Sequence, residues 1–134
     1  MIELGKKYNP HLDLRVGDIE YIPEHEDKFE GAIYAYGLTN LTNDQVINSL
    51  NSCNKNLKEH GKLLILTFEG TTKQYEPEPF DPNLSCYINL FTKDEITSLL
   101  NKTGFKVDHI ECVKETSDNA SGSVIMCILA TKIR

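Results

Sequence analysis

Residues 28–68 read as a strand, a long helix and a second strand, and this order constrains the fold more than any other part of the sequence. The segment 29–36, FEGAIYAY, is apolar at both parities from Ala32 onward, which is typical of a strand covered on both faces. The segment 62–68, KLLILTF, has the same character. Because a helix between two such strands connects them by a right-handed crossover, the strands are expected to be parallel neighbours. This stretch predicts an α/β protein.

The helix between the two strands carries its own start and stop signals. Thr42 and Gln45 form a capping box at its beginning. An apolar stripe at helical spacing follows, made of Val46, Ile47, Leu50, Cys53 and Leu57. Lys58 and His60 suit the negative end of the helix dipole, and Gly61 suits a left-handed cap. The helix is therefore expected to end at Gly61.

The segments before residue 28 are shorter and more polar. Residues 1–8 are predicted to be the end of a helix, because an Asn-Pro pair follows and disfavours its continuation. Residues 12–16 alternate apolar and polar side chains and predict a short strand. The outer edge of 29–36 would otherwise be free, so either the strand 12–16 pairs directly with it or the edge pairs with a second chain. The polar link 19–28 is long enough for the first arrangement, which is favoured.

Residues 69–89 contain three prolines and are predicted to form a long irregular loop. Loops of this length are usually either functional lids or disordered segments. Acidic and aromatic side chains in it could contact a substrate, although a solvated acidic loop is the simpler interpretation.

The last third of the chain begins with a second helix start, in which Thr92 and Glu95 form a capping box. Two strands follow, 105–113 and the very apolar 123–130, and the turn between them makes them antiparallel. Because the run from 124 to 130 needs neighbours on both edges, it is placed inside the sheet. The predicted strand order is 29–36, 62–68, 123–131, 105–113.

Composition limits the class of protein. The 134 residues are expected to form a single domain, 1–134, and a net charge of −6 argues against nucleic acid as a partner. No apolar run approaches the length of a membrane span, so no membrane partner is expected. The four cysteines have no CxxC pair and no zinc-like spacing with histidine. They are interpreted as reduced thiols of a cytoplasmic protein, and no metal site is predicted.

Ligands of open α/β sheets bind outside the carboxyl ends of the parallel strands. Asp18 and Ile19 stand there, where a carboxylate could accept a hydrogen bond and an apolar wall could face a flat ring. Asp18 could equally cap a turn through its own backbone. Tyr34 and Tyr36 could stack on a ligand or belong to the core. Residue chemistry alone stops at an α/β domain with a possible ligand crevice.

Six motifs, taken in order, resemble the C-terminal two thirds of the class I S-adenosylmethionine-dependent methyltransferases. They are MIELGKK at 1–7, VGDI at 16–19, FEGAI at 29–33, LKEHGKL at 57–63, FTKDEI at 91–96 and GF at 104–105. The glycine-rich cofactor loop of that family would precede the first motif and is not in this sequence, which suggests a truncated form. Glu30 stands where the family usually has Asp, and Thr39-Asn40 where many members have two histidines.

The resemblance implies an incomplete Rossmann-like, mostly parallel sheet with helices on both faces and an antiparallel C-terminal strand. It implies S-adenosylmethionine as cofactor, with Asp18 and Ile19 framing the adenine and Tyr34, Ala35 and Tyr36 lining the cofactor. The substrate would be a small molecule, with the proline-containing segment 69–89 over it, and no catalytic residue is assigned.

Two hypotheses follow from this resemblance. One is an active methyltransferase, and the other is an inactive remnant that serves as a dimeric binding or regulatory module. In either case a homodimer through residues 1–40 is expected, because the absent strands would leave apolar surface to be buried between chains.

Overall fold

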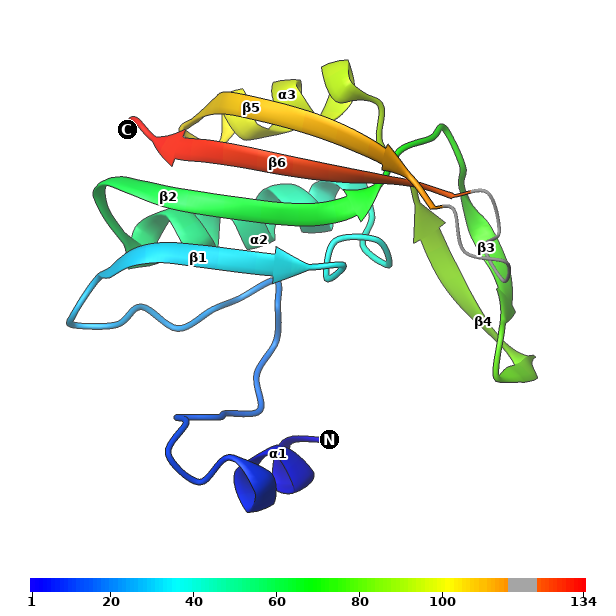
Figure 1. Ribbon diagram of the computed structural model, residues 1–134, viewed down its shortest axis with the longest axis horizontal. Coiled ribbons are helices and arrows are strands. Elements are labelled where there is room, and N and C mark those ends of the chain that lie inside the picture. Colours follow the sequence, from blue (N-terminus) through cyan, green and yellow to red (C-terminus); the bar gives the residue numbers. More distant parts are fainter. Residues whose placement is uncertain (116–122) are drawn as a thin grey trace.

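The computed structural model describes residues 1–115 and 123–134 (Figure 1). The helices are α1 (Ile2–Tyr8), α2 (Asn43–Asn56) and α3 (Lys93–Lys102). The strands are β1 (Phe29–Ala35), β2 (Leu57–Phe68), β3 (Lys73–Glu78), β4 (Asp81–Asn89), β5 (Phe105–Lys114) and β6 (Val124–Lys132). They form a four-stranded sheet and a separate two-stranded hairpin.

The order of the four-stranded sheet is β1-β2-β6-β5, which confirms the predicted order. β1 and β2 are parallel, with α2 as the crossover between them. β6 is antiparallel to both of its neighbours, as predicted, so the α/β fold has a mixed sheet whose parallel part among the described strands is β1 with β2.

The junction of α2 and β2 differs from the prediction. α2 ends at Asn56 and β2 begins at Leu57, so the expected helix end at Gly61 is wrong. The Lys132 ammonium donates to the carbonyl oxygens of Asn54 and Leu57 at 2.9 and 2.8 Å, and these bonds satisfy acceptors at the helix end. His60, and not Gly61, has a positive φ of 62°.

Gly61 is nevertheless required by close packing. A Cβ at this position would lie 2.9 Å from the Lys58 carbonyl oxygen. The register moves from Phe29 opposite Leu57 to Gly31 opposite Lys62, so residues 58–61 form a bulge in β2.

Two further predictions were wrong. The strand at 12–16 was predicted from alternation of apolar and polar residues, and the irregular loop at 69–89 from its prolines. No strand forms at 12–16, because a strand needs a neighbour to receive its backbone hydrogen bonds, and β1 pairs on the β2 side alone within the described residues. The segment 69–89 is not irregular: β3 and β4 pair antiparallel within it. The prolines are tolerated because both strands lie at an edge of this two-stranded sheet.

The helix starts agree closely with the prediction. The Thr42–Gln45 capping box is complete, because each residue's side chain accepts from the other's backbone N–H, at 3.3 and 2.9 Å. At α3, Thr92 accepts from the Glu95 N–H at 3.2 Å. The Glu95 carboxylate, however, turns to other partners, described below. Gly104 ends this region with a φ of 87°.

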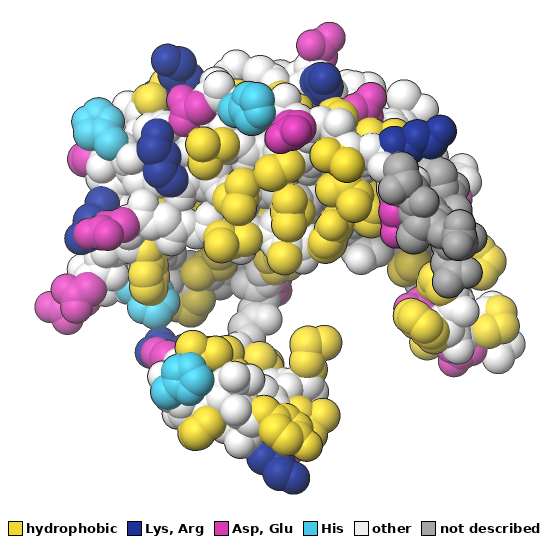
Figure 2. Space-filling model, in the orientation of Figure 1, with side chains coloured by type: hydrophobic (Ala, Val, Ile, Leu, Met, Phe, Trp, Pro, Cys, Tyr) yellow, Lys and Arg dark blue, Asp and Glu magenta, His cyan; other side chains and the backbone are white. Residues whose placement is uncertain are grey.

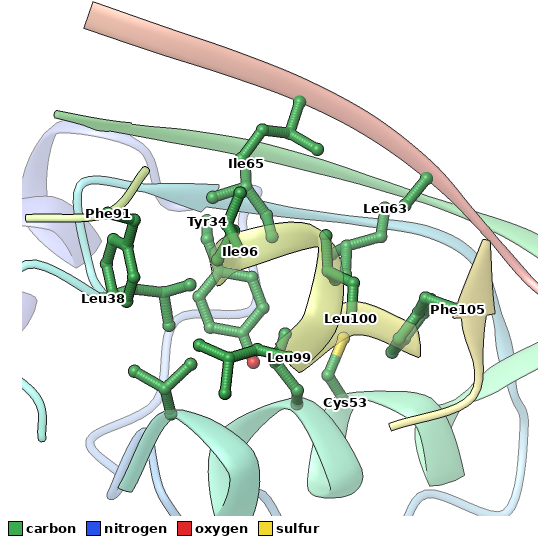
Figure 3. Close-up of a cluster of buried hydrophobic side chains, with 14 of the residues drawn as sticks. Tyr34, Leu38, Cys53, Leu63, Ile65, Phe91, Ile96, Leu99, Leu100 and Phe105 are labelled. Atoms are coloured by element: carbon green, nitrogen blue, oxygen red, sulfur yellow. The ribbon is translucent and has the colours of Figure 1, made fainter. Parts of the chain in front are cut away.

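The core lies on one face of the sheet, between the sheet and both α2 and α3 (Figures 1 and 3). Residues of alternate strand positions, such as Leu63 and Ile65, meet Cys53 of α2 and Leu100 of α3. The expectation of helices on both faces is therefore not met by α2 and α3. α1 lies beyond the edge of β1 and contains no buried residue.

The opposite face of the sheet, here called the open face, is apolar and uncovered in Figure 2. Its apolar side chains alternate with those of the core. They are Ile33, Ala35, Leu64, Leu66, Phe68, Val113, Ile125, Cys127 and Leu129.

Candidate functional site

A cavity of about 560 Å³ lies between β1 and the segment that links α1 to it. Four of the five predicted site residues line it: Asp18 and Ile19 from the linking segment, and Tyr34 and Ala35 from β1. Tyr36 is not among the lining residues. The structure thus brings together residues from two separate segments that the sequence only proposed as neighbours.

Three polar side chains on one face of α2 hold the linking segment in place. Ser49 Oγ donates to the Ile19 carbonyl oxygen at 2.6 Å, and Ser52 Oγ donates to the Glu20 carbonyl oxygen at 3.0 Å. Asn56 Oδ1 accepts from the His25 N–H at 2.8 Å. Sequence reasoning missed these residues, although their spacing places them on the same side of α2, beside its apolar stripe.

Tyr34 supports the cavity wall through its ring, but its hydroxyl belongs to the core. The side chain is 7% exposed, and its Oη lies 2.9 Å from Ser49 Oγ. Because the Ser49 proton is used on Ile19, the Tyr34 hydroxyl is the donor in this contact. Burial raises the pKa of Tyr34, and the nearby Cys53 adds to this rise. Tyr34 therefore stays protonated at neutral pH.

Asp18 has a place both in a turn and in the wall of the cavity. One carboxylate oxygen accepts from the Glu20 N–H at 2.9 Å, and the Asp18 carbonyl accepts from the Tyr21 N–H at 3.2 Å, so the residue does cap a turn. It also lines the cavity. A carboxylate has a second oxygen, which remains available to accept a hydrogen bond from a ligand.

Tyr36 lies past the end of β1, where the chain turns. Its φ of 61° is a left-handed conformation that a bulky residue rarely adopts. Its ring stacks on Phe68 with 5.1 Å between centroids, on the side of the open face. Tyr36 therefore packs on the end of β2 and not in the cavity. Gly37, by contrast, lines the cavity, and a Cβ there would lie 2.8 Å from Ile19 Cδ1.

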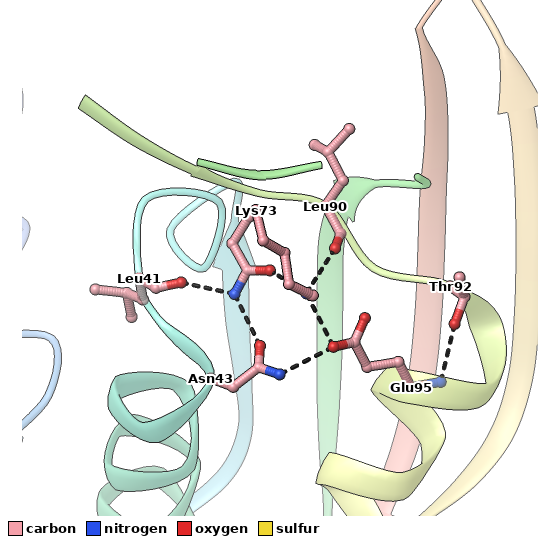
Figure 4. Close-up of polar contacts among 7 residues, drawn as sticks. Leu41, Asn43, Lys73, Leu90, Thr92 and Glu95 are labelled. Atoms are coloured by element: carbon pink, nitrogen blue, oxygen red, sulfur yellow. Dashed lines mark hydrogen bonds and ion pairs between the residues drawn. The ribbon is translucent and has the colours of Figure 1, made fainter. Parts of the chain in front are cut away.

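A second polar cluster stands at the carboxyl end of the sheet, where the hairpin meets the helices (Figure 4). The Glu95 carboxylate contacts the Lys73 ammonium at 2.9 Å and accepts from the Asn43 amide at 2.9 Å. The buried Asn89 donates to the Leu41 carbonyl at 2.7 Å. These bonds connect β3, β4 and the beginnings of α2 and α3, and their partners satisfy one another, which favours a structural role.

Two buried hydroxyls near the same end, Thr39 Oγ1 and Thr67 Oγ1, have no hydrogen-bond partner among the described residues. Unpaired buried polar atoms are uncommon in folded proteins. Thr39 follows β1, and Thr67 lies near the end of β2. Both are therefore at the edge of the sheet where ligands bind in such folds.

Other kinds of site receive no support from the described residues. No group of three or more His, Cys, Asp or Glu side chains among them could hold a metal ion. No helix within residues 1–115 and 123–134 is long and apolar enough to cross a membrane.

Comparison with known proteins places this geometry in a known fold. A methyltransferase from Methanosarcina mazei, described as S-adenosylmethionine-dependent, superposes with a TM-score of 0.81 at 15% identity, covering 98% of this chain and 77% of the other. The 1,6-didemethyltoxoflavin-N1-methyltransferase of Burkholderia thailandensis, solved with 1,6-didemethyltoxoflavin and S-adenosylhomocysteine, gives 0.75 at 18% identity, with 98% and 56% covered. The cyclase SpnF gives 0.71 at 11% identity, with 98% and 60% covered.

No protein-family profile and no curated protein matches this sequence. The solved structures show that the chain has the fold of the S-adenosylmethionine-dependent methyltransferases, and it spans 77% of the first of these chains and a little over half of the second. Because SpnF shares the fold as a cyclase, the fold by itself does not settle the reaction.

Proposed function

We propose that this chain is a methyltransferase-type protein that binds S-adenosylmethionine in the cavity beside β1 and acts on a small molecule. The observation that carries the proposal is the convergence of Asp18, Ile19, Tyr34 and Ala35 on one cavity. The solved methyltransferases with this fold support the cofactor. S-adenosylmethionine would supply an electrophilic methyl group to a nucleophile of the substrate.

The cavity fits the adenine part of this cofactor. Its volume of about 560 Å³ is within the usual range for small-molecule sites, and Ile19 and Ile22 give it apolar walls. The second oxygen of Asp18 could accept from the adenine amino group. No described residue is assigned to the methionine part, and because affinity depends on several contacts made together, we expect binding by the isolated chain to be weak.

The second candidate function is a non-catalytic binding module. Two observations favour it: the Tyr34 hydroxyl is turned into the core, and one Asp18 oxygen is used in its own turn. Chain segments that only stabilise the fold would show the same contacts.

Titration of the isotopically labelled chain with S-adenosylmethionine, followed by backbone amide shifts, separates the candidates. The expected result is saturable shifts of Asp18, Ile19 and Ala35 at millimolar ligand. Asp18→Asn should abolish them, because its single oxygen stays in the turn and its amide nitrogen cannot accept.

Asp27→Asn is the matched control, since Asp27 is an exposed residue of the same linking segment and does not line the cavity. Binding unchanged in Asp18→Asn would refute the placement of the adenine. The absence of any shift in the unmodified chain would favour the binding-module candidate.

A further inference from the structure

The open face is an apolar surface that the helices of residues 1–115 and 123–134 leave uncovered. Ile33, Val113 and Leu129 are 70%, 53% and 37% exposed, Ala35 is also exposed, and the other apolar side chains of this face are half-buried beside them. Figure 2 shows hydrophobic side chains gathered over the strands, with no helix of the described residues above them. Apolar patches of this kind usually mark an interaction site.

The charges on the open face are balanced. Its outward Lys, Asp and Glu side chains are Lys62, Lys106, Asp108 and Glu111, two of each sign, and His109 lies on the same face, opposite Leu129. Lys62 lies 3.3 Å from Asp108, which also bonds Thr131. The chain as a whole carries −6, so its excess negative charge lies elsewhere. A strongly basic or acidic partner would have no complementary charge here, whereas a second copy would meet a neutral surface without repulsion.

The size of the patch also suits a second copy. From the exposed fractions, its apolar side chains present roughly 500 Å² per chain. A standard stable interface buries about 800 Å² per partner. Burial of polar side chains at the rim, such as Lys62 and Glu111, would add to this area when two such faces meet.

We propose that two copies of this chain pack open face against open face, as two sheets about 10 Å apart with interdigitated side chains. The arrangement is isologous, so the same patch serves both copies. Pairing of two β1 edges, the arrangement suggested by an interface at residues 1–40, would leave both open faces exposed. Ile33 also lines the cavity, so the second copy would lie next to its mouth. This inference is independent of the proposed function.

The test measures molar mass by sedimentation or by light scattering coupled to chromatography, at protein concentrations from one to one hundred micromolar. The unmodified chain should show twice its mass of 15.2 kDa. Ile33→Glu should raise the dissociation constant at least about thirtyfold, because it puts a charge in place of a large apolar side chain that the second copy would bury. Because Ile33 is 70% exposed, the variant should keep its circular dichroism spectrum and its unfolding transition.

Leu84→Glu is the matched control, because Leu84 is also an exposed aliphatic residue of a strand, 60% exposed, but lies in the hairpin. It should remain a dimer. A monomeric unmodified chain at one hundred micromolar overturns the proposal. A dimer that survives Ile33→Glu, or one that dissociates in Leu84→Glu instead, overturns the location of the interface.

Discussion

The two faces of the four-stranded sheet are almost equally apolar, yet they have opposite environments. On β2, Leu63 and Ile65 are fully buried under the helices, whereas Leu64 and Leu66 point to the open face. On β6, Met126 and Ile128 are buried, whereas Cys127 and Leu129 are not. One face is a finished core, and the other has the composition of a core without the cover.

This difference explains why the sequence predicted strands covered on both faces. Strand residues of both parities are apolar, which is typical of strands buried on two sides. Among the described helices, α2 and α3 pack against the sheet, and both lie on the same side of it. The apolar character of a strand face therefore indicates that the face needs cover, and not that the described chain provides this cover.

The largest expected effect is a contrast between two phenylalanines. Phe105 is fully buried on the core face, and Phe105→Ala should lower the free energy of unfolding by about 3–5 kcal/mol. Phe68 lies on the open face and stacks on Tyr36, so Phe68→Ala should cost about 1 kcal/mol. Chemical denaturation monitored by circular dichroism gives both values.

Both substitutions should be measured in the Ile33→Glu background, so that association does not add to the apparent stability. Equal losses for Phe68 and Phe105 in this monomeric background would mean that the open face is covered within a single chain. That result would break the contrast between the faces.

Three patterns with a local cause were read correctly from the sequence, although the local signals for a helix end at Gly61 were not. The Thr42 box, the Gly104 cap and the central place of β6 each depend on residues close in sequence or on one very apolar run. The strand at 12–16 was wrong because alternation predicts a strand only where a neighbouring strand exists. The hairpin was missed because three prolines suggested irregular structure.

The candidate site was predictable in part for the same reason. The position of Asp18 and Ile19 after an expected strand, and of Tyr34 and Ala35 in β1, was enough to expect them near one crevice. Tyr36 was misplaced because a positive φ, which periodicity does not reveal, turns its ring toward Phe68. Ser49 and Ser52 of α2 were missed because their hydroxyls donate to backbone carbonyls of a segment without regular structure.

The next effect concerns the bonds that keep both helix starts at the carboxyl end of the core face. Glu95→Gln keeps an acceptor for Asn43 but removes the ion pair with Lys73, and should cost about 1 kcal/mol at pH 7. Burial alone would raise the pKa of Glu95, but hydrogen bonds from Lys73 and Asn43 and the charge of Lys73 lower it overall.

The sign of the pH dependence follows from that lowered pKa. A carboxylate with a lower pKa in the folded state stabilises fully above its unfolded value, here 4.5, and loses the contribution as the pH falls through the folded value. The stability difference between the unmodified chain and Glu95→Gln should therefore shrink below pH 4.5. A difference that stays constant below pH 4.5 would contradict this role of the Glu95 carboxylate.

The smallest effect leaves stability unchanged and compares two thiols, one on each face. Cys53 is 4% exposed in the core, and burial raises its pKa to about 11, although the neighbouring Tyr34 hydroxyl lowers it in part. Cys127 is half-buried on the open face. At pH 8, with iodoacetamide and peptide mass spectrometry, Cys127 should be labelled in monomeric Ile33→Glu long before Cys53, which needs global unfolding to react.

In the unmodified chain the second copy should shield Cys127, so that its labelling slows and the slowing increases with protein concentration. Cys86, in the hairpin strand β4 and away from the open face, should react at the same rate in both forms and serves as the internal reference. Labelling of Cys53 as fast as Cys127 would show that the core face opens as readily as the other. A Cys127 rate that is the same in both forms at every concentration would show that no second copy lies over the open face.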